Sequence, residues 1–239
     1  MILSAAQPYF APYPGFFEKM LKSDVFVLLD TVQFPRGTTW MTRNRFKNDQ
    51  GTLWIRIPVY RKGLGLQRID RVRRLRDPRQ IRKQLSGLEA AYRHAPFFTD
   101  HFGAVQTALE SATGSLAELN TALIRYAARQ LGVRSRVVRL SEIGAGSKGT
   151  ALLADLCCRF RADTFLAQSH ARKYLETGPL AAEGVRLAFF RPRTCIYPQL
   201  WGDFIANLSI FDLLFCCGPK AGAMIDASLA RLYERVPGR

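Results

Sequence analysis

Residues 1–30 read MILSAAQPYFAPYPGFFEKMLKSDVFVLLD, and this stretch opens the pattern that decides the fold. Two short apolar runs rich in β-forming residues lie at residues 2–6 and 25–30. Between them, residues 14–22 carry phenylalanine, methionine and leucine at the spacing of a helix. The stretch therefore predicts a strand, a helix and a second strand.

The same alternation returns in the second half of the chain. Three further strands are predicted at residues 136–140, 164–167 and 185–190. Helical patterns separate them at residues 150–161 and 171–183. Because strands that alternate with helices form parallel sheets, we expect an α/β fold with a mostly parallel sheet and flanking helices. A last helical region, residues 208–217, is apolar on all sides, which indicates burial in the core or under a partner.

Between these two halves, the pattern first predicts a β-hairpin near the N-terminus. Residues 38–47 and 52–59 are strand-like, and residues 48–51 between them have the composition of a tight turn. Residues 66–76 indicate one more strand.

Helices follow the hairpin. Asp77 accepts hydrogen bonds from free N–H groups and Pro78 has no donor to lose, so the pair is typical of a helix start. Helices are predicted at residues 79–94, 96–111 and 115–131. We therefore expect a single α/β domain over residues 1–239 with a helical insertion at about residues 77–131.

The composition is typical of a soluble globular protein, with 48% hydrophobic and 23% charged residues among 239. No apolar run approaches the roughly 20 residues that a bilayer span needs. Residues 1–7 lack the basic region and apolar core of a signal peptide, so we expect a cytoplasmic protein. The five cysteines include no CxxC spacing, so we expect neither a disulfide framework nor a zinc site. We also expect no other metal and no cofactor.

The net charge of +16 indicates anionic partners. Arginine outnumbers lysine 27 to 8, and a guanidinium binds phosphate, sulfate or carboxylate through two parallel hydrogen bonds, although a GC-rich genome produces the same bias. Residues 61–100 carry +7 of the charge, enough to contact a polyanion. No nucleic-acid motif or interleaved aromatic residue accompanies them, which favours a solvated basic face and disfavours nucleic acid.

Several candidate site residues follow predicted strands. Gln7 and Tyr9 lie in an aromatic, proline-rich loop after the first strand, where open α/β sheets bind ligands, although an aromatic turn that packs the helix is an alternative. Asp30 ends the second strand and suits a general base or a turn cap. His170 follows a later strand and is a candidate proton carrier or a surface histidine. Lys148 precedes a helix whose free N–H groups favour anions, although an ordinary capped loop is favoured there.

The hairpin carries a second candidate site. Alternation along a strand places Arg43, Arg45 and Lys47 on one face and Asn44 on the other. Like charges repel without a counter-ion, so this face predicts an oxyanion site, with a solvated hairpin face as the alternative.

Near the C-terminus, polar residues interrupt an apolar run. Asn207, Ser209 and Asp212 are costly to bury unless each is hydrogen-bonded, so we expect a structural polar network.

Together these residues resemble the WbqC-like family from about residue 5 to residue 218. The motifs that carry the resemblance are Gln7-Pro8 with Gly15, residues 23–30, Val32-Gln33-Phe34, Trp40, Arg43-Asn44-Arg45, Tyr197-Pro198-Gln199 and residues 207–215. The chain departs from the family pattern at Thr31, Thr42 and Ala167-Gln168, which predicts a different substrate from that of typical members.

The resemblance implies a metal-independent enzyme of natural-product or surface-polysaccharide biosynthesis. Related proteins form aziridines, in which an amine displaces a neighbouring sulfate, so we expect a small anionic, amine-bearing substrate that loses sulfate or phosphate. Asp30 and His170 are the catalytic candidates. The substrate-binding candidates are Gln7, Tyr9, Gln33, Arg43, Asn44, Arg45, Lys148, Tyr197 and Gln199. The alternatives are an amino-sugar acyltransferase of surface-glycan assembly and a nucleic-acid-binding protein that uses residues 61–83. An accessory protein or a second copy of the chain is the expected protein partner.

Overall fold

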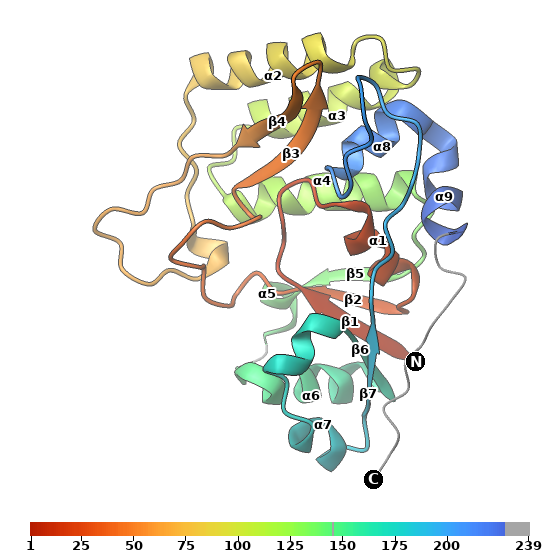
Figure 1. Ribbon diagram of the computed structural model, residues 1–239. Coiled ribbons are helices and arrows are strands. Elements are labelled where there is room, and N and C mark those ends of the chain that lie inside the picture. The colour runs from red at the N-terminus through yellow and green to blue at the C-terminus, as the bar shows by residue number, and fades with distance from the viewer. Residues whose placement is uncertain (145, 228–239) are drawn as a thin grey trace.

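A five-stranded parallel sheet lies at the centre of the computed structural model, which describes residues 1–144 and 146–227 (Figure 1). Across the sheet the strands are β5 (Arg136–Arg139), β2 (Val25–Leu28), β1 (Ile2–Ala6), β6 (Thr164–Gln168) and β7 (Arg186–Phe190). The α/β class and the parallel sheet expected from the sequence are confirmed.

The order of these strands defines a switch point. Counted along the chain, the strands across the sheet are the third, second, first, fourth and fifth. Strands β2 and β5 therefore extend the sheet on one side of β1, and β6 and β7 extend it on the other side. Doubly wound sheets of this order bind ligands where the carboxyl ends of the two central strands diverge.

Helices cover both faces of the sheet (Figure 1). On one face, α6 (Gly149–Phe160) and α7 (Gly178–Ala182) pack on side chains such as Leu3 and Val27. On the other, α1 (Pro14–Leu21) packs on Phe26 with Phe16 and Phe17. Successive residues of a strand point to opposite faces, which is why Phe26 and Val27 enter different cores.

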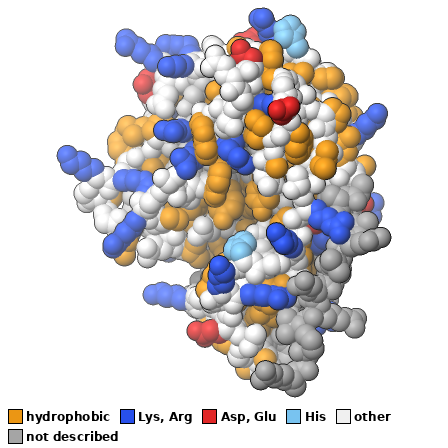
Figure 2. All heavy atoms as spheres, in the orientation of Figure 1, with side chains coloured by type: hydrophobic (Ala, Val, Ile, Leu, Met, Phe, Trp, Pro, Cys, Tyr) orange, Lys and Arg blue, Asp and Glu red, His pale blue; other side chains and the backbone are white. Residues whose placement is uncertain are grey.

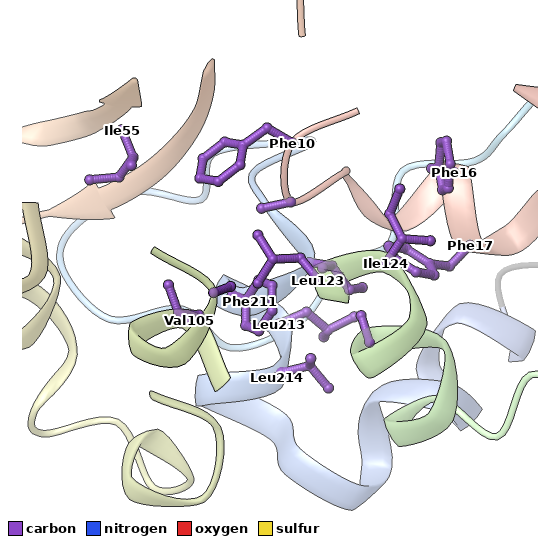
Figure 3. Close-up of a cluster of buried hydrophobic side chains, with 14 of the residues drawn as sticks. Phe10, Phe16, Phe17, Ile55, Val105, Leu123, Ile124, Phe211, Leu213 and Leu214 are labelled. Atoms are coloured by element: carbon purple, nitrogen blue, oxygen red, sulfur yellow. The ribbon is translucent and has the colours of Figure 1, made fainter. Parts of the chain in front are cut away.

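The second core extends from α1 into a helical block. It is built from α2 (Pro78–Tyr92), α3 (Phe98–Glu110), α4 (Leu116–Gln130), α8 (Ile210–Cys217) and α9 (Ala221–Ala227), with a 3-10 turn at Gly218–Lys220. Figure 3 shows Phe211, Leu213 and Leu214 of α8 among side chains of α1, α3 and α4. The expected burial of this apolar helix is confirmed. As the sequence predicts, the side chain of Asp77 accepts a hydrogen bond from the backbone N–H of Arg79 at the start of α2.

The predicted hairpin is present as β3 (Arg43–Asn48) and β4 (Gly51–Arg56), and it lies beside α2. The expectation of a strand at residues 66–76 is wrong. This segment forms a 3-10 turn, Ile69–Arg71, and makes isolated bridges to three different segments, so no continuous ladder forms.

The helix expected at residues 171–183 is broken in two. A 3-10 segment, Ser169–Lys173, is followed by α7, because Gly178 and Pro179 start a new helix. The remaining short helix, α5 (Leu140–Ile143), follows β5. None of the helices within the described ranges is long and apolar enough to span a membrane.

Candidate functional site

A cleft of about 400 Å³ lies at the switch point of the sheet. Its lining comes from the carboxyl ends of β1 and β6 and from the segments that follow them, and includes Gln7, Tyr9, Gln168, His170 and Tyr174. Figure 2 shows a hollow with hydrophobic side chains across the middle of one face, with Lys and Arg side chains around it. We call this site the switch-point cleft.

Lys19 is the lysine among the residues that line this cleft. It lies on α1, its side chain is buried, and its Nζ donates a hydrogen bond to the backbone carbonyl of Ala5 at 2.5 Å. None of the ion pairs among the described residues includes Lys19. Burial disfavours the charged form and lowers the pKa of Lys19 to about 7.

A lysine with this pKa has both protonation states populated at neutral pH. It accepts a proton when neutral and pairs with an anion when protonated, and strongly shifted groups of this kind gather at functional sites. The sequence patterns did not single out Lys19. The available signal was its spacing, because Lys19 follows Phe16 by three residues and therefore shares a side of the helix with it.

The rim of the cleft brings three of the predicted residues together. Gln7 and Tyr9 follow β1, and His170 lies exposed after β6, with its ring 6.5 Å from that of Tyr174. Burial raises the pKa of Tyr9, and the nearby Tyr13 and Tyr174 add to the shift. At the neutral pH of most cells, the Tyr9 hydroxyl therefore keeps its proton and can donate it in a hydrogen bond to a ligand.

Gln168 connects the two sides of the switch point. Its side-chain amide donates a hydrogen bond to the hydroxyl of Tyr13 at 3.0 Å, so the end of β6 is held to the loop after β1. Asn44 fixes the same loop from the hairpin, because its Nδ2 donates to the backbone carbonyls of Phe10 and Ala11.

Asp30 lies outside the lining of the cleft. It is buried, and its two carboxylate oxygens accept hydrogen bonds from the backbone N–H and the hydroxyl of Ser141, at 2.8 and 2.6 Å. The Nε of Arg139 lies 4.0 Å from the same carboxylate. This arrangement caps the first turn of α5, so the structure supplies a structural role for Asp30, and a catalytic role stays a prediction.

The hairpin charges are divided between two environments. The guanidinium of Arg45 donates to the carbonyls of Ala206 and Asn207 at 3.0 and 3.1 Å. The Nζ of Lys47 donates to the carbonyl of Asp203 at 2.5 Å and more weakly to Gln199. Each of these two cations is therefore directed at two or more oxygens of the protein, and Lys47 also interacts electrostatically with the carboxylate of Asp212.

Arg43 differs from its two neighbours on this face. Its guanidinium stacks on the ring of Trp54 at 4.5 Å and lines an open groove beside the hairpin.

Four other predicted residues also lie outside the cleft. The hydroxyl of Tyr197 donates to the buried carboxylate of Asp212 at 2.7 Å, and both sites of the Gln199 amide pair with the backbone of Ile205. Gln33 is exposed and bridges Arg68. Lys148 is exposed at the start of α6.

The polar network expected near the C-terminus is present for Ser209 and Asp212, which are buried, whereas the expectation for Asn207 is wrong because this residue is exposed. Asp212 accepts hydrogen bonds from Tyr92 and Tyr197, and the hydroxyl of Ser209 accepts one from the backbone N–H of Phe211. Because the carboxyl group is buried, the pKa of Asp212 is raised even though both tyrosine hydroxyls lower it.

Residue types suited to metal or dinucleotide binding do not gather at the cleft. Within the parts of the chain that the structure describes, no three His, Cys, Asp or Glu side chains come together as metal ligands. The loop after β1 carries proline and aromatic residues where dinucleotide-binding sheets carry a glycine-rich turn.

Fold and site together define an α/β protein with a cleft at the switch point of a doubly wound parallel sheet. The chain belongs to the WbqC-like protein family, whose family model matches residues 7–224. It is 29% identical over 223 residues to the uncharacterized protein Rv1507c of Mycobacterium tuberculosis. The aligned region covers 92% of this chain and 95% of the relative. No solved structure matches the chain.

Proposed function

We propose that this protein is a small-molecule biosynthetic enzyme that acts in the switch-point cleft on a substrate carrying both an amine and an oxyanion. The observation that carries the proposal is Lys19, a buried cationic group without an acidic partner among the described residues, which lines the cleft. An oxyanion is the partner that this group lacks, and the net charge of +16 favours the approach of anions.

The proposed reaction is attack of the substrate amine on a carbon that bears a sulfate or phosphate group. The carbon–nitrogen bond forms as the carbon–oxygen bond breaks, and the oxyanion leaves with the electron pair of that bond. The proton lost by the amine passes to a base in the cleft. When amine and leaving group are on neighbouring carbons, the product is an aziridine, as the family resemblance implies.

Four residues that line the cleft have a role in this scheme. Lys19, protonated beside the oxyanion, stabilises the charge that builds on the leaving group, which is often the largest single contribution to catalysis. His170 at the rim takes the amine proton. Gln7 and Tyr9 orient the substrate through hydrogen bonds. Lys19 thus replaces Arg43 and Arg45 as the group proposed to bind the departing anion, because Arg45 is bonded to backbone carbonyls and Arg43 lines a different groove.

The test uses 2-aminoethyl hydrogen sulfate, a simple compound with an amine and a sulfate on neighbouring carbons. The intact protein is expected to release sulfate from it, measured by ion chromatography. Lys19→Met and His170→Gln are expected to lower the rate at least tenfold, whereas Arg134→Gln, an exposed arginine on the loop before β5, is the matched control for lost charge. No release above the protein-free rate, or full activity in Lys19→Met, would contradict the proposal.

A further inference from the structure

Four arginines line a second hollow, which lies beside the hairpin and measures about 600 Å³. We call it the arginine groove, and its arginines are Arg36, Arg43, Arg56 and Arg61. The groove shares no lining residue with the switch-point cleft. It is therefore a separate place at which the positive charge of the chain is concentrated.

The register of the hairpin brings two of these arginines together. Arg43 lies directly opposite Arg56 in the antiparallel pair of β3 and β4. Opposed residues have Cβ atoms about 5 Å apart, and like charges at this separation destabilise a sheet. No acidic side chain lines the groove, and none of the ion pairs within the described residues includes any of the four arginines.

The neighbouring cations of the same strand are compensated differently. Arg45 and Lys47 are directed at backbone carbonyls of residues 202–207. Arg43 is the next residue of β3 on this face, and Arg56 lies opposite it on β4. The described partners of these two guanidinium groups include no backbone carbonyl. The charge left without compensation thus lies at the open end of the hairpin.

Two of the guanidinium groups are held in place before any ligand arrives. Arg43 stacks on Trp54, whose ring stacks in turn on that of Trp40 at 5.9 Å. Arg61 lies over the ring of Phe34 at 4.4 Å and donates to the carbonyls that follow it, those of Pro35 and Arg36. Groups that are already ordered lose less conformational entropy on binding.

We propose that the arginine groove is a binding site for the diphosphate group of a small ligand. Guanidinium groups bind phosphate oxygens in bidentate geometry, and several arginines together match the several negative charges of a diphosphate better than those of a single phosphate. Thr38, Thr42 and Gln80 also line the groove and provide uncharged donors. The rings of Trp54 and Phe34 already lie under guanidinium groups, which favours a diphosphate over a single-stranded nucleic acid that needs free rings for stacking.

The experiment is calorimetric titration of the intact protein with inorganic pyrophosphate at low ionic strength and pH 7. One pyrophosphate is expected to bind per chain, more tightly than orthophosphate or sulfate. Arg43→Gln and Arg56→Gln are each expected to weaken binding at least tenfold, whereas Arg134→Gln leaves it within twofold. Arg56 is exposed, so Arg56→Gln remains informative if Arg43→Gln, which loses the stack on Trp54, is poorly folded.

Four outcomes would overturn the proposal. They are the absence of pyrophosphate binding, an equal loss in Arg134→Gln, an equal loss in Lys19→Met, which would place the anion in the cleft, and tighter binding of a short oligothymidine with the same dependence on Arg43 and Arg56. The last outcome would identify the groove as a nucleic-acid surface. Failure here leaves the proposed reaction untouched, because that reaction is tested by sulfate release and by variants of the cleft.

Discussion

The Nζ of Lys19 lies 2.5 Å from the backbone carbonyl oxygen of Ala5, so this side chain of α1 is bonded to β1 at a residue that also lines the switch-point cleft. A carbonyl carries only a partial negative charge and offsets little of the cost of burying an ammonium group. The pKa of Lys19 therefore falls to about 7, so a bound anion would shift the protonation of this side chain towards the charged form.

The first prediction concerns stability as a function of pH. The folded pKa of Lys19, about 7, lies below the ordinary lysine value of 10.5, so between these values the unfolded chain binds more protons. Stability contributed by this site therefore rises with pH over that window. Between pH 7 and pH 9, the free energy of unfolding of the wild type should increase by about 2 kcal/mol more than that of Lys19→Met. Urea denaturation at both pH values measures this, and parallel pH profiles would contradict it.

The second prediction concerns anion binding in the cleft. A bound sulfate favours protonated Lys19, so its affinity should fall about tenfold per pH unit above 7. Sulfate keeps its charge over this range, as do arginines, so the arginine groove contributes no pH dependence. Calorimetry at pH 6 and pH 9 measures the change, with Lys19→Met as the comparison. A pH-independent affinity would show that sulfate does not bind beside Lys19.

The third prediction separates Arg45 from Arg43. Arg45→Ala removes two hydrogen bonds to the carbonyls of Ala206 and Asn207 and should lower the free energy of unfolding by about 1–3 kcal/mol. Pyrophosphate affinity should stay within twofold of the wild type, in contrast to Arg43→Gln. Thermal unfolding and calorimetry on the same samples test both parts, and a loss of affinity with full stability would refute this assignment.

The fourth prediction concerns the buried carboxylate of Asp212. Tyr197→Phe removes one of its two tyrosine donors and should cost about 1–3 kcal/mol, because the group stays buried with fewer hydrogen bonds. Tyr126→Phe is the matched control. The Tyr126 hydroxyl pairs with His101 and donates to the carbonyl of Asp100, but it lies in a partly exposed position, so its loss should cost less. Equal costs in denaturant titrations would argue against a central role for the Asp212 network.

The fifth prediction concerns the turn after α8. Gly218 has φ +50°, and a Cβ there would overlap the ring of Phe97. Gly218→Ala should therefore destabilise the protein by roughly 2–4 kcal/mol. Gly103→Ala on α3 is the control, because that site is open and alanine favours a helix, so stability should hold or rise by up to about 1 kcal/mol. A neutral Gly218→Ala would mean that the turn relaxes freely.

Most elements could be predicted from local patterns. Strands β1 and β6, the hairpin and α4 depend on the spacing of apolar residues and on capping residues, both of which are encoded within a few positions. The structure of residues 66–76 could not be predicted in this way. The segment is rich in β-forming residues, but each of its bridges pairs with a different part of the chain, so no continuous ladder forms.

Of the residues that line the switch-point cleft, only those that follow strand ends could be predicted from the sequence. Gln7, Tyr9 and His170 follow strands, and the carboxyl ends of parallel strands meet at one edge of a sheet, so the sequence could indicate them. Lys19 could not be found this way, because the spacing of residues in a helix does not predict which other segment of the chain packs against each side of that helix.

The amino-acid sequence by itself determined most of the strands and helices, the α/β class, the basic character and the family of this chain, since these follow from residue type and short-range spacing. Only the tertiary structure decided that β1 lies beside β6, that Lys19 lines the cleft, and that Arg45 pairs with Ala206 and Asn207 while Arg43 faces Arg56. The physical reason is that a side chain's charge is set by what surrounds it, and those surroundings come from segments up to about 160 residues away along the chain.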